Sequence, residues 1–473
     1  MRSLLTQWWL VCVAAAFHLV VTLSVSATGH FGLFPNTIDG NGVAIAAAPD
    51  GIKLLREITD RSEELAHARL NEWVSANSPL HVKLYSIPFA ALKPLFGNNV
   101  LSAEPLNALY FVVILMLVFF IGRQILHQRT GLFAAAAVAL CPSFLLHTTQ
   151  LLRDPLFIAA MLGFALICLK LLSRDVSWWS GSIIAIMGGM LGVLLWLVRD
   201  TMADLVIAAA VLTLILLLLK QLVGRPQVKW RARAPAFLSA LLLLTFVGAA
   251  TRLLPKFQRT PQVAQNEPDV WQGSRRQRRN MLIRDPIDSS NPWSRFVARV
   301  GKLRQGFALE FSDAGSNIDS DVSIVTTRDL ISYLPRAAAI GFFAPFPQMW
   351  FRSGVRVSRA ERMVSGVETF ALYLIEFFAV LTLWERRRQV SVWFVWLLAA
   401  VGFVSLGLVV INVGTLYRMR YVFAILMIVL AMHSISKMID RFRASLRSSV
   451  TYFPQGRFAS KVIARANRDR TVP

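Results

Sequence analysis

The sequence predicts an all-α protein that crosses a membrane about ten times, with 10–12 spans as the range. Hydrophobic residues make up 55% of the 473 positions. Apolar runs repeatedly reach the roughly 18 to 20 residues that a helix needs to cross a bilayer. The basic residues lie mostly in short polar segments that flank these runs, which is how membrane proteins set their orientation.

Ten runs are long enough to span at about 1.5 Å of rise per residue. They are 8–27, 105–125, 131–150, 154–173, 181–198, 202–222, 234–254, 366–384, 392–412 and 421–438. With the N-terminus in the cytoplasm, every short loop that is rich in Arg and Lys faces inward, as the positive-inside rule requires. A weak Val-Ser-Ala site at the end of the first run is compatible with a secretory signal, but the tryptophans and His18 of this run favour a retained helix.

Two shorter apolar segments, 84–96 and 337–351, are expected on the outer face as interfacial or re-entrant segments. Counting either one as a span would reverse the loops that follow it. The predicted organisation is a first helix, an outer loop with amphipathic and juxtamembrane helices, six spans, a second large outer loop, three spans and a basic cytoplasmic tail. The boundaries are 1–27, 28–104, 105–254, 255–365, 366–438 and 439–473.

Composition and motifs exclude several classes of protein. The net charge of +23 would suggest nucleic-acid binding in a soluble protein, but here the cations serve topology, so no nucleic-acid partner is expected. The three cysteines lie inside apolar runs, which indicates neither a disulfide framework nor a zinc site. No Walker loop, HExxH or GxSxG motif in a suitable context supports ATP-driven transport or common hydrolase chemistry.

Two Arg-Asp pairs lie at the predicted outer rim, Arg153–Asp154 before the fourth span and Arg199–Asp200 after the fifth. Asp154 followed by Pro155 suits the start of a helix, so this pair is either a helix cap with its neighbouring cation or part of a site.

The first outer loop supplies further candidates. Asp39 and Asp50 can serve as a general base that takes a proton from a hydroxyl, although Asp50 also suits the N-cap of an amphipathic helix. His81 and Tyr85 form a helical pair that either contacts substrate or is a solvated histidine beside an interfacial tyrosine.

Arg418, Arg420 and Tyr421 precede the last span on the outer side, where arginine is not an orientation signal. The guanidinium fork binds phosphate, so these residues suit a lipid-linked phosphate. The alternatives are headgroup anchoring or a salt bridge to Asp154 or Asp200.

The order of these features resembles the GT-C superfamily of membrane glycosyltransferases, which includes protein O-mannosyltransferases, aminoarabinose transferases and Rgt-like bacterial enzymes. The resemblance is carried by PDGIKLLREI at 49–58, SPLHVKLYSIPFAALKPLFG at 78–97, GRQILHQRTGLFAAAAVALCPSFLLHTTQLLRDPLFIAAML at 122–162 and RMRYVFAILMIVL at 418–430. It implies that Asp50 activates the acceptor, with Asp39 as its substitute, that Asp154 is the second acidic position and that Tyr85 belongs to the juxtamembrane motif. The chain departs from the commoner pattern because it lacks an Asp-Glu or Asp-x-Asp pair.

The resemblance implies transfer of a sugar from a polyprenyl-phosphate-linked donor to a hydroxyl of a glycan, lipid or protein acceptor. The reaction would take place on the outer face of a bacterial inner membrane, with membrane lipid as a further partner. Arg418, Arg420 and Arg153 or Arg199 would hold the phosphate. The two separated carboxylates could bind a divalent metal ion or none, and no other cofactor is expected.

Two other functions stay open. An O-antigen or exopolysaccharide polymerase or ligase would depend on loop arginines such as Arg275 and Arg276. A transporter of lipid-linked saccharides would use a charge within the bilayer, such as Glu376.

Overall fold

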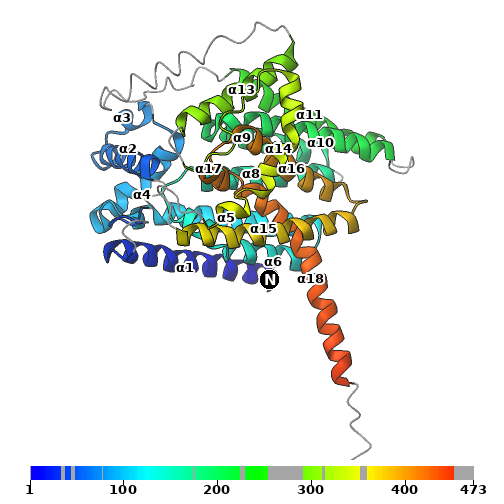
Figure 1. The fold of residues 1–473 in the computed structure, drawn as a ribbon, viewed down its shortest axis with the longest axis horizontal. Coiled ribbons are helices and arrows are strands. Elements are labelled where there is room, and N and C mark those ends of the chain that lie inside the picture. Colours follow the sequence, from blue (N-terminus) through cyan, green and yellow to red (C-terminus); the bar gives the residue numbers. More distant parts are fainter. Residues whose placement is uncertain are drawn as a thin grey trace, which may run out of the picture.

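The structure is a computed structural model, and it confirms the all-α class in the part of the chain that it describes (Figure 1). The described residues are 2–33, 38–43, 48–76, 78–173, 176–223, 230–253, 291–311, 315–351 and 359–451. Within these ranges the only β pairing is an isolated bridge between Asn317 and Asn412.

The first half of the chain contains α1 (Arg2–His30), α2 (Ala48–Ala66), α3 (Leu70–Ser75), α4 (Leu80–Phe96), η2 (Val100–Ala103), α5 (Glu104–Ile125), α6 (Gln128–Ala139), α7 (Pro142–Thr148), α8 (Asp154–Ser173), α9 (Trp178–Val198), η3 (Asp200–Met202), α10 (Ala203–Val223) and α11 (Trp230–Leu253). The second half contains α13 (Pro292–Glu310), α14 (Thr327–Phe343), η5 (Pro347–Met349), α15 (Arg359–Glu385), α16 (Val390–Val409), α17 (Val413–Met419) and α18 (Tyr421–Thr451).

Among the described residues, eight helices are long and apolar enough to cross a membrane, or nine if one bent pair forms a span. Ten spans were expected. The predicted span 131–150 is the bent pair, α6 and α7, whose axes differ by 72°. Pro142 opens α7, and proline both lacks an amide donor and clashes with the preceding turn, so one straight helix cannot run through this point. The predicted span 234–254 lies in α11, where the apolar stretch is shorter, Ala234–Ala250.

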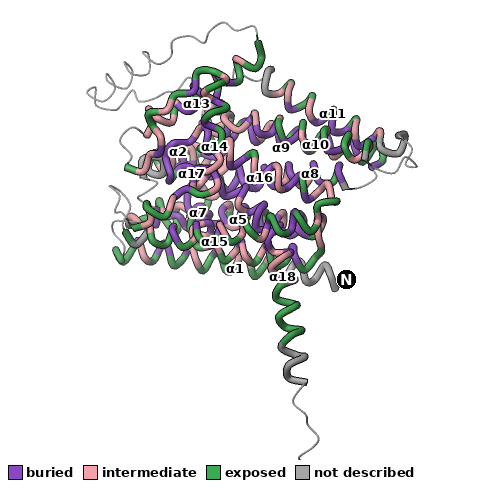
Figure 2. Tube along the Cα trace, turned by 45° about the vertical axis from the view of Figure 1, so that its right-hand side comes forward, coloured by how far each residue is buried: buried purple, intermediate pink, exposed green. Residues whose placement is uncertain are grey.

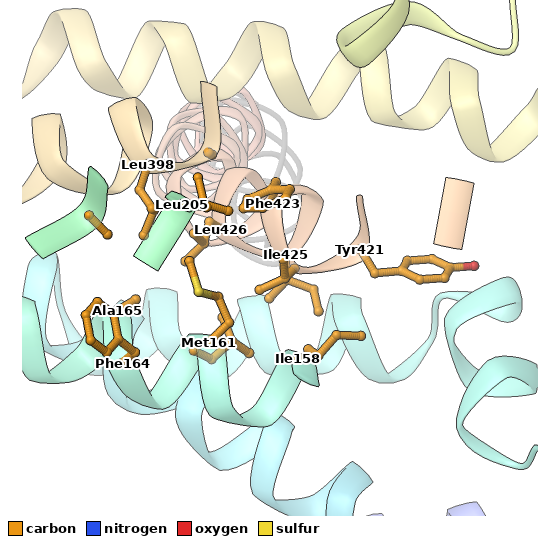
Figure 3. Packing of buried hydrophobic residues seen from close by; sticks show 14 of the residues in the cluster. Ile158, Met161, Phe164, Ala165, Leu205, Leu398, Tyr421, Phe423, Ile425 and Leu426 are labelled. Carbon is orange, nitrogen blue, oxygen red and sulfur yellow. The ribbon is translucent and has the colours of Figure 1, made fainter. Parts of the chain in front are cut away.

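The helix α8 forms the centre of the bundle. It is the most buried of the candidate spans and packs against α5, α9, α10, α16 and α18. Figure 3 shows Met161 and Phe164 of α8 meeting residues of α10, α16 and α18, including Leu426. A helix that is apolar on every face is buried, because it has no polar face that water could solvate. In a bilayer, close packing between helices provides the attraction. Figure 2 shows the result, with buried positions along α8 and α16 and exposed positions along α1 and α15.

One end of the bundle, which we call the rim, is where α8 and α18 begin and α9 ends. The first loop folds here: α2 packs on α4, and α4 packs against α5. The predicted interfacial segment 84–96 lies within α4, which buries Tyr85 and Phe89. The other predicted segment, 337–351, divides into the end of α14 and η5, joined through a cis peptide bond before Pro345.

Candidate active site at the rim

The rim holds a buried ion pair between the first residue of α8 and Arg199, the residue that follows the last residue of α9. Nη2 of Arg199 lies 2.6 Å from Oδ1 of Asp154, and both residues are buried. Nε2 of His147 lies 3.8 Å from the other oxygen of Asp154. The two Arg-Asp pairs of the sequence thus meet through Asp154 of one pair and Arg199 of the other, which belong to different helices.

Arg199 has unused hydrogen-bonding capacity. Its Nε and Nη1 have no hydrogen-bond partner among the residues that the structure describes. Burial lowers the pKa of the Arg199 guanidinium to about 10, and the charge of Asp154 opposes this shift. A buried polar group without a partner is costly, so two such donors on one guanidinium indicate a place for an anionic ligand.

Two further arginines act on this pair electrostatically. Arg153 is exposed beside Asp154, and Arg418 of α17 is partly buried. The charges of both lower the pKa of the Arg199 guanidinium further, as expected for nearby cations. We call His147, Arg153, Asp154, Arg199 and Arg418 the rim cluster. Four of its members, all except His147, were predicted. The structure brings the five together from α7, the start of α8, the end of α9 and α17.

Tyr85 of α4 makes hydrogen bonds to Asn107 and to the segment that precedes Asp154. Its hydroxyl lies 2.8 Å from Oδ1 of Asn107 and 3.1 Å from the carbonyl oxygen of Leu152, and burial raises its pKa. The side chain is fully buried, and His81 of the same helix is buried as well. This placement favours a structural role for both residues over the predicted contact with substrate.

The first-loop acid Asp39 lies in a turn next to the rim. Its Oδ1 accepts hydrogen bonds from the backbone amides of Asn41 and Val43, at 2.9 and 2.7 Å. The carbonyl oxygen of Gly42 in the same turn accepts a bond of 3.2 Å from Nε2 of Gln150, which precedes Asp154 by four residues. Asp50 lies in the first turn of α2 and Asp200 begins η3. The side chains of these two residues lie outside the described part of the structure.

The other predicted arginine, Arg420, is engaged by the protein. It is buried, donates to the carbonyl oxygen of Ala344 and to Oγ1 of Thr369, and stacks on the ring of Tyr417 at 4.6 Å. Burial lowers its pKa. The placement favours a role in holding α17 and the α14 end together over the predicted phosphate contact. Tyr421 is buried too, with its ring 5.5 Å from that of His147.

Sequence reasoning missed His147 and Glu368. The carboxylate of Glu368 on α15 accepts from the amide of Ser143 at 2.8 Å and from the hydroxyls of Ser143 and Tyr417. Its only signal in the sequence is an acidic residue at the edge of an apolar run. Among the described residues, no three His, Cys, Asp or Glu side chains form a group that could hold a metal ion.

Comparisons with known proteins bear on this arrangement. Residues 88–251 match the family described as dolichyl-phosphate-mannose-protein mannosyltransferase. No curated protein sequence matches the chain. Among solved structures, the archaeal oligosaccharyltransferase AglB from Archaeoglobus fulgidus, in complex with an inhibitory peptide and a dolichol-phosphate, is similar with a TM-score of 0.43 and 13% identity. That similarity covers 83% of this chain and 46% of AglB, so the chain spans less than half of that protein.

A second solved structure, ArnT from Cupriavidus metallidurans bound to undecaprenyl phosphate, is similar with a TM-score of 0.35 and 14% identity, over 90% of this chain and 77% of ArnT. The family match includes the segment that carries both Asp154 and Arg199. Over that part of the chain it agrees with the resemblance stated from the sequence.

Proposed function

We propose that the protein is a membrane glycosyltransferase that moves a sugar from a polyprenyl-phosphate-linked donor to an acceptor hydroxyl. The observation that carries the proposal is Arg199, a buried guanidinium held by Asp154 with two donors unused within the described structure. The matched family is described by a sugar donor on a dolichyl phosphate, which is the same chemical class of donor.

The rim cluster would hold the phosphate. Arginine donates several hydrogen bonds to phosphate oxygens from one planar group, and Nε and Nη1 of Arg199 are the nitrogens left for this role, each with its own direction. Arg153 and Arg418 would add positive charge from either side. Asp154 would act through Arg199, since its carboxylate holds the guanidinium in place.

The acceptor would be activated by a first-loop carboxylate, Asp50 or its substitute Asp39. The acceptor oxygen attacks the anomeric carbon and gives its proton to the carboxylate. The bond between that carbon and the phosphate oxygen breaks, and polyprenyl phosphate leaves with the electron pair. Donors already fixed around the phosphate stabilise the charge that develops on it. The turn of Asp39, tied to Gln150 through Gly42, would place this loop beside the phosphate.

The rim would face the outside of a bacterial inner membrane. Basic residues gather at the opposite end of the bundle, where Lys437 pairs with Glu385 and Arg129 with Asp440. Lys437 follows Tyr421 by 16 residues in one helix, or roughly 24 Å. This distance is close to a bilayer thickness, and the basic end is the cytoplasmic one under the positive-inside rule. The acceptor would be a glycan, lipid or protein of the cell envelope.

The test is a transfer assay on the purified full-length protein with radiolabelled polyprenyl-phosphate sugars and bacterial envelope extract as acceptor. We expect wild type to move the label and Asp50→Asn to abolish transfer while leaving expression and fold intact. Asp39→Asn is the matched substitution in the same loop. Loss with Asp39→Asn alone would move the base to Asp39, and full activity of both variants would refute a first-loop base.

A transporter of lipid-linked saccharides is the second candidate. Glu376 in the middle of α15 is buried, and its Oε1 has no partner among the described residues. Charged groups at such depth often line transport pathways. Movement of donor across vesicles without transfer of label would favour this function. The polymerase alternative rests on Arg275 and Arg276, which lie outside the described residues.

A further inference from the structure

Residues 148–152 comprise the last residue of α7 and most of the connection to α8, and side chains from other parts of the chain bond to this segment at several positions. Asn107 of α5 donates to the carbonyl oxygen of Thr149 at 3.2 Å. Tyr85 of α4 lies within hydrogen-bond distance of the carbonyl oxygen of Leu152. The next two residues are Arg153 and Asp154, so this segment determines the positions of these two members of the rim cluster.

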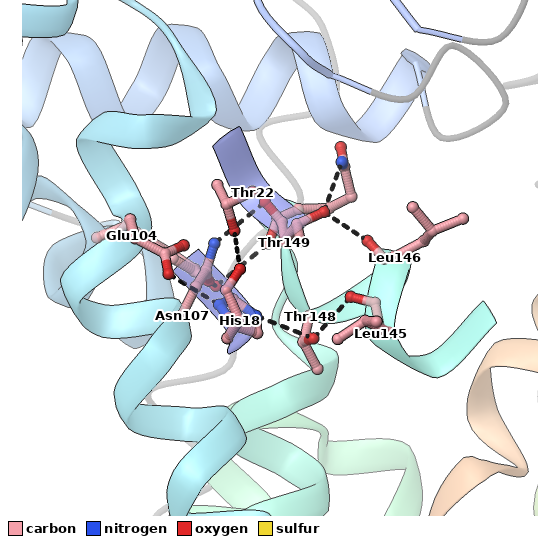
Figure 4. A network of polar contacts seen from close by, with 10 residues as sticks. His18, Thr22, Glu104, Asn107, Leu145, Leu146, Thr148 and Thr149 are labelled. Atoms are coloured by element: carbon pink, nitrogen blue, oxygen red, sulfur yellow. Dashed lines mark hydrogen bonds and ion pairs between the residues drawn. The ribbon is translucent and has the colours of Figure 1, made fainter. Parts of the chain in front are cut away.

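Thr148, the first residue of this segment, is bonded to a buried pair of residues on α1 and α5. Nδ1 of His18 lies 2.9 Å from Oε1 of Glu104, and Nε2 of His18 lies 3.1 Å from Oγ1 of Thr148 (Figure 4). All three residues are buried. One imidazole therefore joins α1, α5 and the end of α7.

The available protons fix the direction of these bonds. The hydroxyl of Thr148 donates to the carbonyl oxygen of Leu145 at 2.8 Å, so its oxygen has to accept from Nε2 of His18. His18 then carries a proton on Nε2, and one further proton lies between Nδ1 and the Glu104 carboxylate. Whichever atom holds it, the pair has no net charge, which is the condition for burying two ionisable groups in an apolar bundle.

We propose that His18 and Glu104 are positioning residues for the active site. They hold Thr148, and through residues 148–152 they keep Arg153 and Asp154 where the donor phosphate binds. This inference rests on the proposed function. An apolar pair would attach α1 to α5 without the cost of burying polar groups, but only a donor such as Nε2 of His18 can bond to the oxygen of the Thr148 hydroxyl.

The decisive variant is Thr148→Val. Valine has a similar size but lacks the hydroxyl, and the His18–Glu104 pair stays intact. Thr22→Val is the matched control, because Thr22 is buried and its hydroxyl donates within α1, to the carbonyl oxygen of His18. Glu104→Gln tests the pair itself. Each full-length protein is measured for kcat and KM with the donor, for binding of a polyprenyl phosphate alone, and for Tm.

We expect Thr148→Val and Glu104→Gln to lower kcat/KM for the donor by about tenfold to a hundredfold, as small misplacements of binding groups do. Both should weaken binding of the polyprenyl phosphate, while Thr22→Val leaves both quantities unchanged. If Thr148→Val matches Thr22→Val in both, the inference is overturned although transfer by wild type still stands. If Glu104→Gln lowers Tm but not kcat/KM, the pair only attaches α1 and the inference fails as well. Wild type that neither transfers sugar nor binds the phosphate overturns the proposed function itself.

Discussion

Replacing Arg199 with lysine separates the charge of this residue from its hydrogen-bonding fork. Lysine keeps a positive charge that can reach Asp154, but its single ammonium cannot replace two separate nitrogen donors that are fixed in one plane. Arg199 has two nitrogens, Nε and Nη1, that are unpartnered among the described residues. A hydrogen bond to a charged group contributes about 1.5–3 kcal/mol, so losing two costs about 3 kcal/mol at the low end. That free energy corresponds to roughly a hundredfold weaker binding.

The assay is equilibrium binding of a polyprenyl phosphate to the purified protein, with transfer measured in parallel. Arg153→Lys is the matched control, because Arg153 is exposed next to the same carboxylate and has no comparable buried fork. We expect Arg199→Lys to lose roughly a hundredfold in affinity and Arg153→Lys to lose little. A folded Arg199→Lys variant that binds the phosphate as wild type does would refute the assignment of this guanidinium to the phosphate.

Two further predictions concern stability. Gly42 has a φ of +80°, and a Cβ there would lie 2.8 Å from Cγ2 of Val100. Gly42→Ala should therefore destabilise the protein by about 1–3 kcal/mol. An unchanged Tm would contradict this reasoning. A hydrogen bond from Arg336 lowers the pKa of Asp319, so this carboxylate stabilises the fold above its ordinary pKa and the contribution is lost as the pH falls through the lowered value. Asp319→Asn should therefore flatten the loss of Tm below about pH 5 relative to wild type, and parallel curves would argue against the ion pair.

Much of the helical layout was predictable because run length and apolarity decide it. The predicted span 154–173 coincides with α8, which is apolar on all sides. The predicted span 131–150 was wrong as a straight helix, because averaging over an apolar run ignores Pro142, whose ring ends one helix and starts another.

The candidate site was predictable only in part. Charged residues at the ends of apolar runs had to gather at the bundle ends, which brought Asp154, Arg199 and Arg418 into one cluster. What each side chain binds depends on partners from distant segments. Arg420 meets the carbonyl of Ala344, 76 residues away in sequence, and no local spacing contains that information.

The charge balance of the rim cluster explains why an ion pair is useful at a phosphate site. Asp154 begins α8 and Arg199 ends α9, so each charge lies at the helix end whose dipole favours it. Three arginines against one aspartate leave an excess of two positive charges among the described side chains of the cluster. A donor phosphodiester carries one negative charge, whereas the departing polyprenyl phosphate, a monoester, carries about 1.5 to 2 near neutral pH. The cluster therefore complements the charge of the leaving group better than that of the bound donor. Interactions that strengthen as the bond breaks are those that lower the barrier, and this is the condition for sugar transfer at the rim.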